Sequence, residues 1–291
     1  MGLKVGGTGR FGECMKRVVL SCTTSDTYDF FLPISARLWR ERIGYEPVSI
    51  LIGTPREWGS YGHCKVVLNE LLGSGFPVEL VGHVPGITDA NVSMAVRQQA
   101  AALPWLDPND LLIVGDVDLF PIRSEFYNQP DPSKDQITIC HAGIHGERFW
   151  PAYGPRMSVA AWREVMGIVA GNLKRSLEDA FRDGKIEELI AANKADYRDS
   201  RLWFFDEEYA SSKIRASRFE ILRVQSNGWE RLCKNSWPAV VNALDYIDCH
   251  CPRPGWNKEN WDKIRNVLSQ VMSSDDLSWS DRYVAAYRSS V

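Results

Sequence analysis

The sequence predicts an α/β fold in which helices cover a mainly parallel sheet. Short apolar runs alternate with helical patterns through the first 140 residues, and no internal repeat or change of composition marks a linker. The chain has 291 residues, of which 44% are hydrophobic, so one large core can form. We therefore expect a loose, glycine-rich tail over residues 1–15 and a single domain over 16–291 with a more irregular C-terminal half.

Strands are expected where short apolar runs are bounded by glycine or polar residues. These ranges are 17–24, 47–53, 78–81, 110–115, 136–140 and 219–224. The run over 110–115 is the clearest of them, and it leads directly into Asp116-Val-Asp118. Because helical patterns separate most of these runs, the strands are expected to pair in parallel.

Helices are expected where apolar residues recur at every third or fourth position. One such pattern starts at Phe30 and ends before Gly44, a residue that favours a helix C-terminus. Asp89 is the expected N-cap of a helix over 90–103, which Pro104 closes. Further helices are expected over 157–169, over 172–195 with a break at Gly184, and over 203–215.

Charge and cysteine content exclude some classes of partner and compartment. The net charge is −3, from 34 basic and 37 acidic residues, whereas proteins that grip nucleic acid usually carry a basic excess. No segment reaches the roughly 18–20 apolar residues of a membrane helix, and the N-terminus lacks the apolar core of a signal peptide. Seven scattered cysteines do not resemble a disulfide framework. We expect a cytoplasmic protein with no nucleic-acid partner and no membrane span.

Two carboxylates, one residue apart, follow the clearest strand. Asp116 and Asp118 stand where the strand over 110–115 emerges, directly after Gly115. Ligands bind at this carboxyl edge in open α/β sheets. Paired carboxylates there suit Mg²⁺ or Mn²⁺, which can bridge a diphosphate. Acidic residues also end strands in ordinary turns, but the position of these two at a buried strand end favours a functional site.

With this motif the sequence resembles the GT-A class of nucleotide-sugar glycosyltransferases, which have a Rossmann-like fold. The matching segments occur in the family's order between about residues 17 and 255. They are Val18 to Asp26, the helix carrying Arg97, Asp116-Val-Asp118, Tyr153-Gly154-Pro155, Asp206-Glu207 and His250. The resemblance implies that residues 16–125 bind the nucleotide sugar and that 126–291 bind the acceptor and carry catalytic groups.

The resemblance also implies roles on the donor side. Asp118 would ligate the Mn²⁺ or Mg²⁺ ion, and Asp116 would hold the ribose or reach the ion, directly or through water. Arg97 would contact the base or the diphosphate, although an ordinary solvated helix residue fits the sequence equally well. The base would be lined by residues at the end of the first strand, Thr23, Thr24 and Asp26.

A second acidic motif follows an aromatic run in Arg201-Leu-Trp-Phe-Phe-Asp-Glu-Glu-Tyr209. An inverting transferase needs a base to remove the proton of the acceptor hydroxyl, and an apolar wall can raise the pKa of a carboxyl group toward a useful value. Either Asp206 or Glu207 is expected to be this base, because adjacent helical residues lie about 100° apart and Glu208 points elsewhere. Acidic residues are also favoured at helix starts for purely structural reasons.

A third motif lies in Tyr246-Ile-Asp-Cys-His-Cys-Pro-Arg-Pro-Gly255. The resemblance makes His250 a nitrogen ligand of the metal, which favours Mn²⁺ over Mg²⁺, and lets Arg253 pair with a phosphate. A plain turn with an unliganded histidine is an open alternative. Another is a zinc site made of Cys233, Cys249, His250 and Cys251, although no Cys-X-X-Cys spacing supports it.

Aromatic and glycine residues gather over 141–154, between a predicted strand and a predicted helix. Because sugar rings pack on the faces of Trp and Tyr, the acceptor side is expected at Trp150, Tyr153 and Gly154. A loop that buries its aromatic residues over the core would give the same pattern. No role is assigned to His63 or His83.

The sequence therefore predicts a metal-dependent glycosyltransferase that moves a hexosyl or deoxyhexosyl group from a UDP- or GDP-sugar to a hydroxyl group of a glycan or glycoconjugate, with inversion. A sugar nucleotidyltransferase shares the donor chemistry and is the nearest alternative. A phosphatase with Asp116 as nucleophile is disfavoured, because that motif typically opens the chain. A non-catalytic carbohydrate-binding protein is a further alternative, which the two acidic motifs disfavour.

Overall fold

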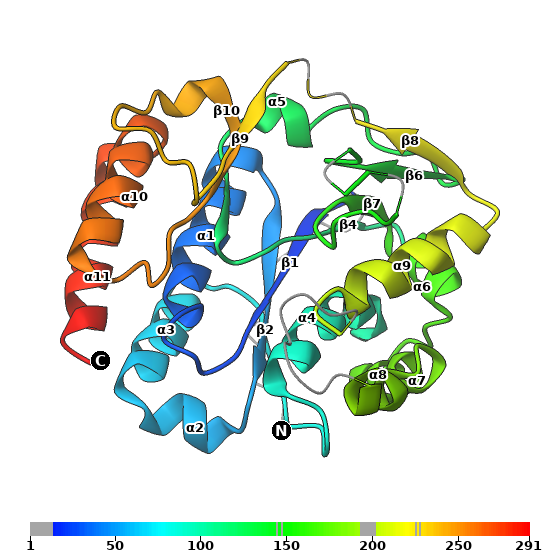
Figure 1. The fold of residues 1–291 in the computed structure, drawn as a ribbon. Helices are drawn as coiled ribbons and strands as arrows, with labels where there is room; N and C mark the ends of the chain where they lie inside the picture. Colours follow the sequence, from blue (N-terminus) through cyan, green and yellow to red (C-terminus); the bar gives the residue numbers. More distant parts are fainter. Residues whose placement is uncertain (1–13, 144, 147, 193–201, 225, 227) are drawn as a thin grey trace.

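The computed structural model of the chain describes residues 14–143, 145–146, 148–192, 202–224, 226 and 228–291. A seven-stranded sheet crosses the molecule between two groups of helices, and a three-stranded sheet lies beside it (Figure 1). Most of the predicted tail, residues 1–13, lies outside the described residues.

The large sheet contains, in order across it, β3 (Val78–Val81), β2 (Glu46–Ile52), β1 (Lys16–Cys22), β4 (Leu111–Val114), β7 (Pro155–Ser158), β6 (Gln136–Ile139) and β8 (Glu220–Arg223). β7 runs antiparallel to its neighbours β4 and β6, and all other pairs in this sheet are parallel. This arrangement confirms the predicted α/β fold, a mainly parallel sheet flanked by helices.

The helices form two groups, one on each face of the sheet (Figure 1). The first group contains α1 (Leu32–Leu38), α2 (Pro55–Ser60), α3 (Gly62–Gly73), α10 (Lys258–Val271) and α11 (Ser274–Arg288). The second contains α4 (Asp89–Gln99), α6 (Val159–Met166), α7 (Leu173–Asp183), α8 (Ile186–Ala192) and α9 (Phe205–Ala216). Val18 and Leu20 of β1 enter the first core and Val19 the second, because successive strand side chains point to opposite faces. A strand buried on both faces can therefore be apolar throughout.

The small sheet consists of β5 (Leu119–Pro121), β10 (Tyr246–His250) and β9 (Glu230–Leu232), with β10 in the middle. β5 directly follows Asp118 and pairs antiparallel with β10, so that Leu119 lies opposite His250. The backbone N–H of Cys251 donates to the carbonyl oxygen of Asp118 at 2.8 Å. This pairing brings two motifs that are far apart in the sequence to one place.

Several predicted helix boundaries differ from the structure, two of them for a clear reason. Thr88, and not Asp89, is the N-cap of α4, because the Thr88 hydroxyl accepts the backbone N–H of Asn91 at 3.3 Å. The helix predicted over 157–169 begins later, since residues 155–158 form β7 and Ser158 caps α6. The end of the helix predicted over 172–195 falls partly on residues outside the described ones.

Five helices of the described ranges have no counterpart in the prediction: α2, α3, α5 (Ser124–Tyr127), α10 and α11. Three of them begin at an ordinary side-chain cap, such as the reciprocal capping box of Thr54 and Glu57 that begins α2, whereas α3 and α5 have no capping side chain. The last two helices pack on the first core, where α11 lies beside α3. No helix in the described ranges is both long and apolar enough to cross a bilayer.

Candidate active site

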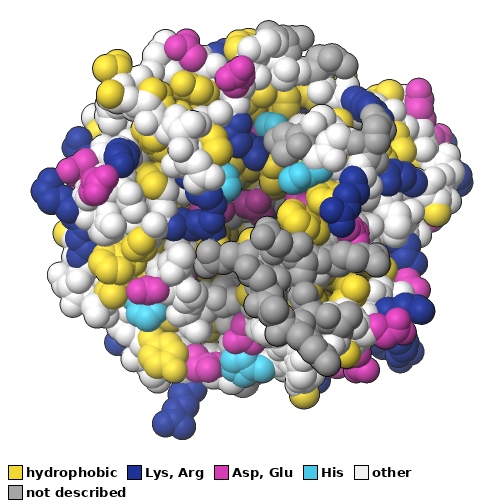
Figure 2. Space-filling model, viewed as in Figure 1, with side chains coloured by type: hydrophobic (Ala, Val, Ile, Leu, Met, Phe, Trp, Pro, Cys, Tyr) yellow, Lys and Arg dark blue, Asp and Glu magenta, His cyan; other side chains and the backbone are white. Residues whose placement is uncertain are grey.

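A cavity of about 520 Å³ lies at the carboxyl edge of β1 and β4. Its wall includes the ends of these strands, one face of α4, the first turn of α9 and the segments that follow β9 and β10. Figure 2 shows acidic, basic and histidine side chains gathered around a hollow near the centre of this face. Nine of the predicted site residues line the cavity: Thr23, Arg97, Asp116, Asp118, Tyr153, Asp206, Glu207, His250 and Arg253.

Two of the predicted acceptor-side residues do not line the cavity. Trp150 is buried in the second core, and the guanidinium of Arg215 lies 4.7 Å from its ring centre. Gly154 is packed so closely that a Cβ atom would lie 2.7 Å from the carbonyl oxygen of Cys140. The glycine is required for close backbone packing, and Tyr153 alone of this predicted set faces the cavity.

Two of the predicted base-binding residues also lie outside the lining. The carbonyl oxygen of Thr24 faces the ring of His63, 3.2 Å from its Nε2 atom. The carbonyl oxygen of Asp26 accepts the indole N–H of Trp256 at 3.1 Å. Within this predicted set only Thr23 lines the cavity, and the backbone carbonyls of the other two residues contact neighbouring side chains.

Arg97 is buried and joins two carboxylates across the cavity wall. It lies on the cavity face of α4 and forms ion pairs with Asp116 and, at 3.2 Å, with Asp206. It also donates to the carbonyl oxygen of Gly115 at 3.0 Å. Burial raises the pKa of Asp206 despite the opposing charge of Arg97. The surface-exposed role that the sequence allowed for Arg97 is therefore wrong, since its side chain is only 7% exposed.

Asp118 lies in a cluster of positive charge. Its Oδ2 atom is 3.3 Å from Nε2 of His250 and 3.5 Å from Nε of Arg253. The Nζ atom of Lys234 lies 3.1 Å from the same His250 nitrogen. Burial by itself would raise the pKa of Asp118, but His250 and Arg253 outweigh it and lower that pKa below its ordinary value. This carboxylate therefore stays ionised at neutral pH.

The side chains of Asp118 and His250 fit a divalent cation. Their facing oxygen and nitrogen lie 3.3 Å apart, close to the about 3 Å that separates neighbouring ligands of an octahedral ion with bonds of about 2.1 Å. Asp116 does not form a cluster with them, because among the described residues these three side chains do not bring their metal-binding atoms within 4.8 Å of one another; its Oδ1 atom pairs with Arg97. The protein ligands that fit an ion are thus one carboxylate and one imidazole. Most coordination positions of the ion would remain open for oxygen ligands from solvent or a bound molecule.

The competing zinc site at Cys233, Cys249, His250 and Cys251 is not formed. Among the described residues, three side chains with metal-binding atoms all within 4.8 Å of one another occur only at Asp29, His63 and Cys64. All seven cysteines are free thiols. The predicted zinc interpretation of the third motif is therefore wrong.

Glu207 differs from its neighbour Asp206 in having an oxygen without a hydrogen bond. Its Oε1 atom accepts the backbone N–H of Ala152 at 3.1 Å, whereas its buried Oε2 atom accepts no hydrogen bond within the described residues. The Nε2 atom of His145 lies 3.6 Å from this Oε2 atom. Burial, and then the charge of Asp206, raise the pKa of Glu207 to about 8. Such a carboxylate is suited to accept a proton near neutral pH.

Sequence reasoning missed the cations Arg231 and Lys234, which also line the cavity. Arg231 donates to the two oxygens of buried Asp248 at 2.7 and 3.2 Å, and to the hydroxyl of Tyr153 at 2.6 Å. Although burial opposes them, Arg231 and His141 hold the pKa of Asp248 well below its ordinary value. Asp248 was the available signal, because an acidic residue in an apolar strand needs a buried cation.

No family model matches the chain, and no curated protein matches it. Among solved structures, the glycosyltransferase GlyE of Streptococcus pneumoniae TIGR4 is similar at 12% identity and a TM-score of 0.42; the match covers 92% of this chain and 65% of that chain. A glycosyltransferase involved in glycosylation of the major capsid of PBCV-1 gives 12% identity, a TM-score of 0.38 and coverages of 88% and 99%. Glucosyl-3-phosphoglycerate synthase of Mycobacterium tuberculosis has 14% identity and a TM-score of 0.36; the match covers 90% of this chain and 80% of that chain. These are likenesses of fold.

Proposed function

We propose that the chain is a nucleotide-sugar glycosyltransferase that transfers a hexosyl or deoxyhexosyl group from a UDP- or GDP-sugar to a hydroxyl acceptor on a glycan or glycoconjugate. One observation carries the proposal. The same cavity, at the carboxyl edge of a mainly parallel sheet, holds a cation-binding pair and, apart from it, a carboxylate with a raised pKa. The first suits a diphosphate leaving group and the second suits activation of a hydroxyl group.

On the donor side, Asp118 and His250 would hold the ion, Mn²⁺ in preference to Mg²⁺ because one ligand is an imidazole. A bound ion there neutralises charge on the diphosphate leaving group. Lys234 and Arg253 flank this pair and can contact the phosphate oxygens directly. Asp116, which is partly exposed and oriented by Arg97, is in place to accept a hydrogen bond from the ribose.

On the acceptor side, Glu207 would remove the proton of the attacking hydroxyl group. The proton passes to its free Oε2 atom, the acceptor oxygen bonds to the anomeric carbon, and the nucleoside diphosphate leaves with the electrons of the broken C–O bond. Direct attack of this kind inverts the anomeric centre. Trp203, Phe204 and Tyr153 line the cavity as well and offer aromatic faces to a sugar ring.

The free thiols accord with a cytoplasmic site of action.

The test is release of nucleoside diphosphate from UDP-, GDP- and dTDP-sugars in the presence of Mn²⁺, with a panel of hydroxyl acceptors. The expected result is acceptor-dependent release from one class of donor, a metal requirement, and a product of inverted anomeric configuration by NMR. No release from any donor, or full activity with EDTA, would contradict the proposal. Release of pyrophosphate from a nucleoside triphosphate and a sugar phosphate would instead point to a nucleotidyltransferase.

A further inference from the structure

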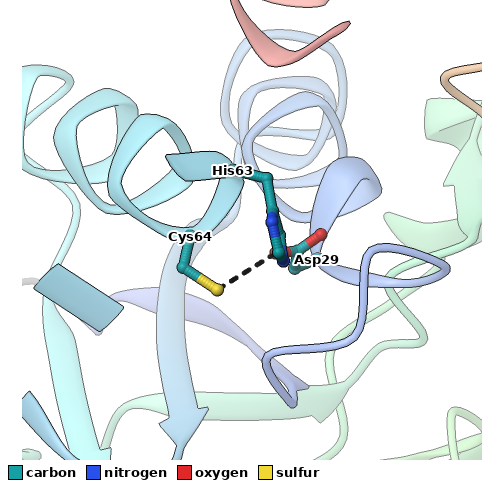
Figure 3. Close-up of side chains that lie close together, drawn as sticks. All are labelled: Asp29, His63 and Cys64. Atoms are coloured by element: carbon teal, nitrogen blue, oxygen red, sulfur yellow. Dashed lines mark hydrogen bonds and ion pairs between the residues drawn. The ribbon is translucent and has the colours of Figure 1, made fainter. Parts of the chain in front are cut away.

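Three metal-binding side chains lie together behind the loop that follows β1, outside the lining of the active-site cavity. His63 and Cys64 belong to the first turn of α3, and Asp29 begins the short 3-10 helix Asp29–Phe31 (Figure 3). Asp29 and Cys64 are fully buried, whereas the side chain of His63 is 18% exposed. The metal-binding atoms of all three lie within 4.8 Å of one another.

The spacing of these atoms matches a tetrahedral zinc site. Oδ2 of Asp29 is 3.6 Å from Nε2 of His63 and 3.6 Å from Sγ of Cys64. The carbonyl oxygen of Thr24 is 3.2 Å from the same nitrogen and 3.9 Å from the same sulfur. Tetrahedral Zn²⁺, with bonds of about 2.0–2.1 Å to nitrogen or oxygen and about 2.3 Å to sulfur, separates N and O ligands by about 3.3 Å and S and O ligands by about 3.6 Å.

The charge of Asp29 gives an independent reason for a cation here. This carboxylate is fully buried, yet its ion pairs within the described part of the chain include no Lys or Arg, only the weakly basic ring of His63. A buried carboxylate without a cation carries a large desolvation cost. The Tyr287 hydroxyl of α11 donates to the other oxygen, Oδ1. This hydrogen bond orients the carboxylate as outer partners of metal ligands do.

The chemistry of these three side chains favours one kind of metal ion, and the surroundings of the Cys64 thiol exclude a role as nucleophile. A thiolate, an imidazole and a carboxylate together suit Zn²⁺ and not Mg²⁺ or Ca²⁺, which prefer oxygen ligands. Cys64 is not a nucleophile, because it has no exposed surface and burial raises the pKa of its thiol far above the ordinary value.

We propose that Asp29, His63 and Cys64 bind one structural Zn²⁺ ion, with the carbonyl oxygen of Thr24 as the fourth ligand. On binding, Cys64 loses its thiol proton to solvent, and the partly exposed side of His63 is the path by which the ion enters. The ion ties the start of α3 to the loop after β1. Thr23 and Ser25, on either side of Thr24, line the active-site cavity. Occupancy of the site therefore fixes the backbone on the donor side; this last effect rests on the proposed function.

The experiment measures zinc binding by the purified full chain in competition with a chromogenic chelator. It is done in a His250→Ala background, which removes the nitrogen ligand of the other candidate metal site. The expected result is about one equivalent of bound Zn²⁺, with Co²⁺ giving the charge-transfer absorption of a thiolate ligand. Cys64→Ser should lose the cobalt band, and His63→Gln, which retains an amide that can contact Thr24, should weaken zinc binding at least about 100-fold.

Cys140→Ser is the matched control, because Cys140 is also a fully buried free thiol but lies outside the cluster. It should keep zinc binding and the cobalt band, and circular dichroism should show all variants folded. Equal zinc binding by the control and the two cluster variants, or no zinc binding by any form, would overturn the site. These outcomes do not depend on transferase activity. If the His250→Ala form binds zinc as expected but the wild-type chain releases no nucleoside diphosphate, only the proposed function is contradicted.

Discussion

The cavity holds two pairs of carboxylates in which one member of each pair shares a cation and the other members lie in opposite electrostatic surroundings. The pairs are Asp116 with Asp118, and Asp206 with Glu207. Arg97 binds one member of each pair, Asp116 and Asp206. A single buried guanidinium therefore balances one carboxylate of each motif, and the two motifs become parts of one site.

The second members of the two pairs, Asp118 and Glu207, make their contacts with other residues. Asp118 lies beside His250 and Arg253, which lower its pKa against the effect of burial. Glu207 is buried with one oxygen unbonded, and burial together with the charge of Asp206 raises its pKa. A carboxylate held ionised among cations suits a metal ligand, and a carboxylate that titrates near neutral pH suits a base. The comparison assigns different chemistry to groups that look alike in the sequence.

Replacing Glu207 by Gln is expected to have the largest effect on catalysis. Without an ionisable group at this position kcat should fall by about 10² to 10⁴, while donor affinity measured by calorimetry stays unchanged, because Glu207 is assigned to the acceptor. Glu208→Gln is the matched control, since Glu208 is next on α9 and forms an ion pair with Arg148. Near wild-type transfer by the Glu207 variant would remove this residue from the role of base.

Arg97→Met should give the largest loss of stability. Removing the partner of two buried or partly buried carboxylates should lower the free energy of unfolding by about 3–5 kcal/mol in guanidinium titrations. Arg218→Met is the control: this exposed arginine also pairs with two carboxylates, Glu164 and Asp135, and its loss should leave the free energy of unfolding nearly unchanged. Equal stability of the two variants would mean that Arg97 does not hold the pairs together.

Asp118→Asn tests the other side of the comparison. We expect turnover to fall by about 10² to 10³, and the remaining activity to lose its dependence on Mn²⁺, because the ionised ligand is gone. The measurement is a Mn²⁺ titration of turnover at saturating donor, with Asp116→Asn alongside as the variant that keeps the Asp118 and His250 pair. An unchanged Mn²⁺ response in the Asp118 variant would exclude it as a metal ligand.

The smallest expected effect is a shift of the pH profile. Because the base must be ionised, kcat/KM should rise with pH and level off above about 8. Asp206→Asn removes a negative charge that contributes to the raised pKa of Glu207, so the midpoint should move to lower pH. A midpoint within the ordinary carboxyl range in the wild type, or one that does not move in the variant, would contradict the assignment.

Most strands of the large sheet were predictable because they are short apolar runs bounded by glycine or polar residues. The strand β7 was missed because Pro155–Ser158 merges with the helical pattern that follows it. Helices α10 and α11 were missed although Asn257 and Ser273 are ordinary N-caps. Their apolar side chains pack in the same core as those of α1 and α3, which lie far away in the sequence, so the local pattern gives little indication of these helices.

The same limit applies to the site. Both acidic motifs were found because their carboxylates are adjacent in the sequence and stand at element ends. The role of Arg97 was not found in this way, because its partners Asp116 and Asp206 lie 19 and 109 residues away in the sequence. Trp150 has the composition of a sugar-binding residue, but only tertiary packing determines that it faces the core. Residue type identified candidates, and long-range pairing determined which of them can react.

The most direct test of the account compares four isosteric variants, Asp116→Asn, Asp118→Asn, Asp206→Asn and Glu207→Gln, for turnover and for free energy of unfolding. We expect the two members of each pair to differ in which property they lose, turnover or stability. The Asp118 and Glu207 variants should lose most of their turnover, whereas the Asp116 and Asp206 variants should retain more turnover and lose stability, because Arg97 is left with an unpaired charge. The opposite division, or equal losses in all four variants, would contradict the central claim that Arg97 separates supporting carboxylates from reacting ones.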